Sequence, residues 1–129
     1  NPGFGGNTKW AYQELAATRT AVAPLSLVHR ELDRQSRMSW DQLIDAAEND
    51  FEAPVFAAHG KLREIKKILQ DHGAEIALLS GSGATVFGVF VDEARARQAR
   101  AQFASESVMK VFVFPTCSGP LGWRHERSR

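Results

Sequence analysis

The segment of this sequence best suited to chemistry is a loop rich in glycine and serine. Residues 79–87 read Leu-Ser-Gly-Ser-Gly-Ala-Thr-Val-Phe. Backbone N–H groups around Gly81 and Gly83 can form a concave nest that attracts phosphate oxygens, and the hydroxyls of Ser80 and Ser82 add donors. No helix is expected directly after the loop, so it is neither a Walker loop nor a dinucleotide fingerprint. The residues alone favour a plain hairpin turn, with a phosphate-contacting loop as the alternative.

Acidic and metal-ligating side chains elsewhere in the sequence form no clear candidate for a metal site. Four carboxylates lie close together in the sequence, those of Asp45, Glu48, Asp50 and Glu52. Magnesium prefers such oxygen ligands, but a solvated acidic face explains them more simply. The four histidines have no metal-ligand spacing, and Cys117 has no evident activating partner. The sequence therefore predicts no metal site.

The elements that must hold these residues are expected to be mainly helices. Helices are predicted over about residues 8–19, 40–48, 61–72 and 93–104, with N-caps at Asn7 or Thr8, Ser39 and Asp92. The clearest is 61–72, where apolar residues recur at helical spacing and Gly73 can end the helix. Pro54 can open another short helical stretch. Residues 20–37 are interpreted as a connector that can include a helical turn.

Two apolar runs predict a β-hairpin around the glycine-rich loop. They occupy residues 75–80 and 84–91 and are joined by residues 81–83. A third strand is expected at 108–114, and the tail 115–129 is expected to be loose. The order of helices, hairpin, helix and strand predicts an α+β fold, with helices packed on one face of a small antiparallel sheet.

Length and composition narrow the class of protein. A chain of 129 residues is long enough for one compact domain and too short for two, so residues 1–129 are expected to form a single domain. The net charge of +1 indicates no general attraction to nucleic acid, and no apolar run is long enough to cross a membrane. A single cysteine excludes an internal disulfide framework and fits a cytoplasmic setting. Because the chain begins Asn-Pro-Gly, without Met or a signal peptide, we expect it to be a piece of a longer protein.

Three segments together resemble one enzyme family. The loop is similar to the Gly-Ser-Gly-x-Thr-Val-Phe motif of the GHMP small-molecule kinases. Asn49-Asp-Phe-Glu-Ala-Pro54 and Pro2-Gly-Phe-Gly-Gly-Asn-Thr-Lys-Trp-Ala-Tyr12 resemble segments of the branch that acts on an alcohol linked to cytidine diphosphate. The motifs follow the family's order and approximate spacing over residues 2–92, although Gly6-Asn7 replaces a common Val-Ser pair. The resemblance implies the C-terminal domain of such a kinase, with a ferredoxin-like fold.

The resemblance also implies roles for particular residues. In the family, the threonine and the aromatic residue at the positions of Thr8 and Tyr12 line the cytidine pocket. Their spacing places a hydroxyl one helical turn from a ring that can stack on a pyrimidine. The alternatives are that Thr8 only caps a helix and that Tyr12 is a core residue. The loop residues of the family that buttress its ATP-phosphate loop correspond to Ser80, Gly81, Ser82 and Gly83.

The catalytic parts of the family have no counterpart in this sequence. The resemblance places the ATP loop, catalytic aspartate and catalytic lysine in an N-terminal lobe that is expected to be absent, so no catalytic residue and no independent kinase activity are expected here. The implied parent reaction uses ATP with Mg²⁺ in the non-mevalonate route to isoprenoid precursors. The implied partners are the cytidine-diphosphate-linked substrate and the N-terminal lobe. Two alternatives remain: a stand-alone α+β small-molecule-binding or regulatory domain, and a GHMP kinase for homoserine or mevalonate.

Overall fold

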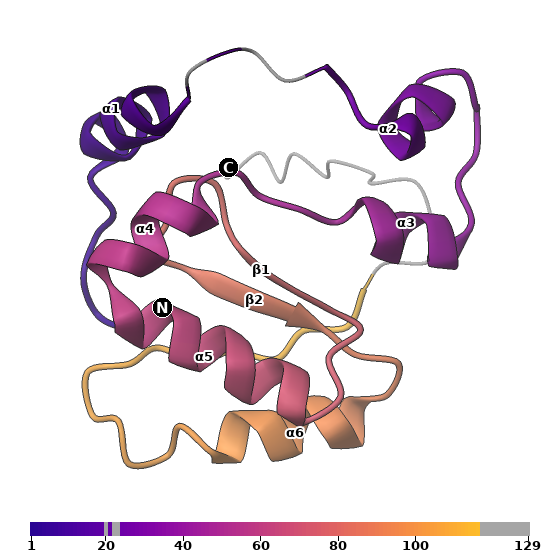
Figure 1. Cartoon of the computed structure of the whole chain (residues 1–129). Helices are drawn as coiled ribbons and strands as arrows, with labels where there is room; N and C mark the ends of the chain where they lie inside the picture. The colour runs from indigo at the N-terminus through magenta and orange to yellow at the C-terminus, as the bar shows by residue number, and fades with distance from the viewer. Residues whose placement is uncertain (20, 22–23, 117–129) are drawn as a thin grey trace, which may run out of the picture.

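Six α-helices surround one β-hairpin in the part of the chain that the structure describes (Figure 1). The structure is a computed structural model and describes residues 1–19, 21 and 24–116. The elements in chain order are α1 (Thr8–Thr18), α2 (Leu27–Leu32), α3 (Trp40–Ala46), α4 (Glu52–Ala58), α5 (Gly60–Asp71), β1 (Ile76–Leu79), β2 (Val86–Val89) and α6 (Glu93–Ala101). This architecture confirms the α+β class expected from the sequence.

The core lies between α5 and the hairpin. The strands are antiparallel and pair from Ile76 opposite Val89 to Leu79 opposite Val86. The α5 helix contacts both strands, and α4 continues the helical layer over the same face (Figure 1). The residues of α5 that recur at helical spacing, Leu62, Ile65 and Leu69, are buried. Their burial confirms the amphipathic helix predicted here, because one apolar stripe of the helix covers the sheet.

Local capping signals position the helices as the sequence predicts. Asn7, Ser39 and Asp92 each accept a backbone N–H from the first turn of the helix that follows. Ser39 and Gln42 complete a reciprocal capping box. Beyond the last turn of α5, Gly73 has a φ of +87°, a conformation that favours glycine. Each signal acts over only a few residues, so these helix boundaries were predictable.

The connector before α3 contains a helix rather than an isolated turn. Ser26 caps α2, and its hydroxyl is 2.7 Å from Nδ1 of His29. The other ring nitrogen of His29 lies 3.2 Å from the Ala46 carbonyl oxygen, which joins α2 to the end of α3. The indole of Trp40 donates a hydrogen bond to the Glu75 carboxylate. The α2–α3 pair is therefore tied to the start of the hairpin, beside which it lies (Figure 1).

Residues 108–114 correct the sequence prediction, because they form no strand. Their side chains still alternate, partly buried and exposed in turn, from Val111 to Phe114. A strand also needs a neighbour with which to exchange ladder hydrogen bonds. In this segment the backbone of Lys110 pairs with that of Asn1 alone, through bonds of 2.8 and 2.9 Å. The sheet described here therefore has two strands instead of the expected three.

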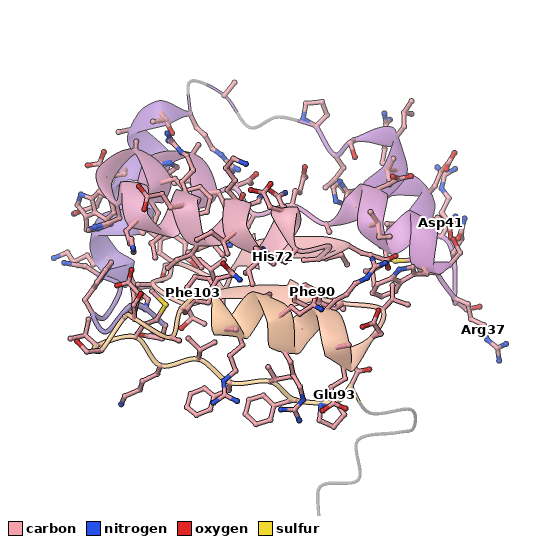
Figure 2. The ribbon with its side chains drawn as sticks, turned by 90° about the horizontal axis from the view of Figure 1, so that it is seen from below. Arg37, Asp41, His72, Phe90, Glu93 and Phe103 are labelled. Carbon is pink, nitrogen blue, oxygen red and sulfur yellow. The ribbon has the colours of Figure 1, made fainter. Side chains whose placement is uncertain are left out.

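Aromatic side chains fill the layer between α5 and α6. Figure 2 shows Phe90 and Phe103 in this layer, whereas Arg37 extends away from it. Phe103 is buried and Phe90 packs against the same core.

No helix among the described residues is long and apolar enough to span a membrane. Cys117 and the tail from residue 117 onward lie outside the described residues.

Candidate functional site

The glycine-rich loop forms a tight turn at the end of the hairpin. The Ser80 N–H donates to the Thr85 carbonyl at 2.8 Å, and the Gly83 N–H donates to the Ser80 carbonyl at 3.0 Å. Gly81 and Gly83 have φ values of +55° and +89°. Side chains are rarely tolerated in that region, so the turn requires glycine at both positions. The hairpin-turn interpretation of these glycines is confirmed, and it leaves a phosphate role open.

The start of α1 lies directly against this loop. A hydrogen bond of 2.9 Å joins the hydroxyls of Thr8 and Ser82 across 74 positions of sequence. Nearby, Gly6 packs against the backbone of Gly83 so closely that an added Cβ would collide with the Gly83 carbonyl group. Thr8 is not the helix cap, because Asn7 holds that position. The alternative that Thr8 only caps a helix is therefore wrong.

Tyr12 lies one turn further along α1 and lines an open cleft. Its side chain is 59% exposed, which shows that the core-residue alternative is wrong. The ring meets Phe51 edge-on, with centroids 4.8 Å apart and an interplanar angle of 80°. The cleft has a volume of about 410 Å³, and its other lining residues include Leu15, His29, Glu48, Asn49 and Asp50. That volume is within the range of small-molecule sites.

The carboxylates near the cleft have separate partners. Asp50 forms an ion pair with Arg19, and a Glu48 oxygen lies 3.6 Å from Nδ1 of His29. Glu52 pairs with Lys66 on α5. The residues that the structure describes contain no group of three or more His, Cys, Asp or Glu side chains that could hold a metal.

Asn49 contacts the loop in a way that the sequence interpretation missed. Its side-chain amide donates to the Leu79 carbonyl at 2.7 Å and to the Gly81 carbonyl at 2.8 Å. From the sequence, Asn49 has no role beyond its place in a family motif, and its acidic neighbours Asp50 and Glu52 are interpreted as a solvated face. The segment 49–52 and the glycine loop belong to the same family pattern. That shared pattern was the signal in the sequence that the two segments are in contact.

Comparison with known protein families identifies the class to which the chain belongs. Residues 28–108 match the family described as GHMP kinases C terminal. The match covers more than half of the chain, so the chain belongs to this family. No solved structure shows a significant match.

Curated relatives narrow the comparison to one kind of kinase. The chain is 34% identical over 112 residues to the 4-diphosphocytidyl-2-C-methyl-D-erythritol kinase of Syntrophus aciditrophicus, which covers 87% of this chain and 38% of the relative. It is 37% identical over 115 residues to the enzyme of the same name from Syntrophotalea carbinolica, covering 88% and 38%. The match to the Solibacter usitatus enzyme is 37% over 92 residues, covering 70% and 29%. The resemblance seen in the sequence is confirmed, and the chain spans between 29% and 38% of the length of these relatives.

Proposed function

We propose that residues 1–129 form one domain, the substrate-binding part of a kinase that phosphorylates 4-diphosphocytidyl-2-C-methyl-D-erythritol. One observation carries the proposal. A single helix, α1, meets the glycine-rich loop through Thr8 and lines the open cleft through Tyr12. A ligand in which an aromatic base is followed by a diphosphate needs such a pair of adjoining surfaces. The names of the relatives support the same substrate.

In this proposal the cytidine end of the substrate binds in the cleft. The exposed ring of Tyr12 offers a stacking surface for the pyrimidine, and its edge-on contact with Phe51 fixes the orientation of the ring. The phosphates extend toward the loop of residues 80–83. Thr8 then helps to hold the substrate at the junction between cleft and loop, where it contacts Ser82.

The chain contributes positioning rather than chemistry to the proposed reaction. Phosphoryl transfer needs an oriented hydroxyl and neutralised phosphate charge, for which kinases use Mg²⁺ with ATP. The loop contains no carboxylate that could orient a hydroxyl, and the described residues assemble no metal site. We therefore place the catalytic groups in the part of such kinases that this chain does not cover, and we expect no phosphorylation by residues 1–129 alone. The proposed pathway is the non-mevalonate route to isoprenoid precursors, in the cytoplasm.

The test is calorimetric titration of the chain with cytidine diphosphate. We expect saturable binding that Tyr12→Ala weakens by at least about fivefold, because stacking of a base on an aromatic ring is worth about 1–3 kcal/mol. Tyr12→Phe retains the ring and should bind like the original chain. Phe114→Ala is the matched control, since Phe114 is also exposed but does not line the cleft. Equal affinity of Tyr12→Ala and the original chain, or no binding at millimolar ligand, would contradict the proposal.

A further inference from the structure

Asn49 uses its side chain to organise the backbone on both sides of Ser80. Its amide nitrogen donates to the carbonyl oxygens of Leu79 and Gly81, at 2.7 and 2.8 Å. Its carbonyl oxygen accepts the Phe51 N–H at 3.0 Å. Both N–H donors of the amide and one lone pair of its oxygen are therefore used. The side chain is fixed, and it fixes two carbonyl groups of the loop.

Glu52 holds the same part of β1 by a complementary contact. One carboxylate oxygen accepts the Leu79 N–H at 2.8 Å, and the other bonds to the ammonium group of Lys66 at 2.5 Å. The side chains of Glu52 and Lys66 are only 17% and 21% exposed. Both backbone polar groups of Leu79 are thus bound by side chains of one short segment. The point where β1 ends and the loop begins is held from two directions.

The contacts of Asn49 and Glu52 engage some backbone polar groups at the loop, while other backbone groups of the loop stay without a partner. The carbonyl groups of Leu79 and Gly81 are engaged by Asn49. Within the described part of the chain, the N–H groups of Gly81 and Ser82 donate to no backbone carbonyl, and the carbonyl groups of Ser82 and Gly83 accept no backbone N–H. Free N–H groups attract phosphate oxygens, whereas free carbonyl groups repel them. Asn49 also lines the cleft next to Tyr12, so one residue contacts both halves of the candidate site.

We propose that Asn49 and Glu52 are positioning residues, which hold the loop of residues 80–83 so that the N–H groups of Gly81 and Ser82 are available to the phosphates of the substrate. The inference rests on the proposed function for its ligand, a cytidine nucleotide. It assigns to the segment 49–52 a role in the site beyond capping a helix. It also separates two contributions to binding, the base in the cleft and the phosphates at the loop.

Two pairs of variants in the full chain test the proposal. Asn49→Asp preserves the acceptor for the Phe51 N–H but turns a carboxylate oxygen toward two carbonyl groups, so the loop must move. Glu52→Ala removes both the acceptor for the Leu79 N–H and the ion pair with Lys66, whereas Glu52→Gln removes the ion pair but can retain the acceptor. Gln70→Glu is the control, because it makes the matched amide-to-acid change on the exposed face of α5, outside the cleft.

The readouts are the ¹H–¹⁵N amide signals of Gly81, Ser82 and Gly83, and the affinities for cytidine and for cytidine diphosphate. We expect Asn49→Asp and Glu52→Ala to shift these signals and to reduce the preference for cytidine diphosphate over cytidine by about tenfold, the value of one strong hydrogen bond to a charged group. In Glu52→Ala, whose changed residue does not line the cleft, the affinity for cytidine itself should not change. Glu52→Gln and Gln70→Glu should behave like the original chain.

The possible failures are distinguishable. Unshifted loop signals in folded Asn49→Asp would overturn the positioning role, whether or not the nucleotide binds. If Asn49→Asp does not fold, the comparison of Glu52→Ala with Glu52→Gln decides. Equal amide signals of the loop in these two variants would overturn the positioning role. If the original chain shows no preference for cytidine diphosphate over cytidine, the assignment to phosphates fails together with the proposed function, even where the loop signals shift.

Discussion

At the scale of single residues, the site depends on glycines, which have no side chain, as much as on residues whose side chains form contacts. Gly6 and Gly83 allow the segment before α1 and the glycine-rich loop to touch through their backbones. That approach brings the Thr8 and Ser82 hydroxyls within hydrogen-bond distance. A valine at position 6, as is common in the family, would not fit this geometry, because its Cβ would collide with the Gly83 carbonyl group. The departure from the family pattern therefore has a physical consequence at the loop.

Gly6→Ala should destabilise the chain by about 1–3 kcal/mol, the usual cost of forcing atoms into a packed region. The new Cβ would collide with the Gly83 carbonyl group, and backbone cannot move aside as a flexible side chain can. Urea unfolding measures the change. Gly5→Ala is the matched control, since a Cβ there meets nothing within 4 Å. Equal stability of the two variants would show that the close approach is not maintained in solution.

At the scale of elements, short-range signals were sufficient for the helices and insufficient for the last strand. The caps at Ser39 and Asp92 and the apolar stripe of α5 act within a few residues, and each was predicted. The alternation of residues 108–114 was also visible, but strand formation depends on a partner elsewhere in the chain. For the same reason, the contacts of Thr8 with Ser82 and of Asn49 with Gly81 could not be derived from local spacing. Only the family resemblance brought these segments together in advance.

Asp92→Ala should lower the free energy of unfolding by about 1 kcal/mol, the typical value of an N-cap. Asp92 accepts the Arg95 N–H at 2.8 Å, and its negative charge is favourable at the start of α6. Asp92→Asn retains the acceptor and should lose only a fraction of that stability. Urea unfolding of the three chains provides the comparison. A loss in Asp92→Asn as large as in Asp92→Ala would assign the effect to charge instead of capping.

At the scale of the whole molecule, some apolar side chains form a buried core and others are exposed, among them two rings on the segment after α6. Phe103 is 6% exposed and packs in the core, whereas Phe112 and Phe114 are 68% and 76% exposed. The two exposed rings stack on each other with centroids 5.8 Å apart. Removal of apolar surface from water is the main stabilising contribution to folding, so these groups should differ greatly in their importance.

Phe103→Ala should destabilise the chain by about 3–5 kcal/mol, as expected for truncating a buried aromatic ring. Phe112→Ala and Phe114→Ala should each cost less than about 1 kcal/mol, because their rings are already largely hydrated. Thermal and urea unfolding measure both. A large loss of stability in Phe114→Ala would mean that this ring is covered in solution.

The contacts at Leu79 also affect how the sheet can grow. An edge strand with free N–H and C=O groups is a template on which strands of other molecules can assemble, and such assembly leads to aggregation. At Leu79 both groups are already bonded, to Glu52 and to Asn49. A strand arriving at this end of β1 would first have to displace two side chains. Asn49 and Glu52, which hold the loop, thus also hinder the pairing of strands from other molecules with this part of the sheet edge.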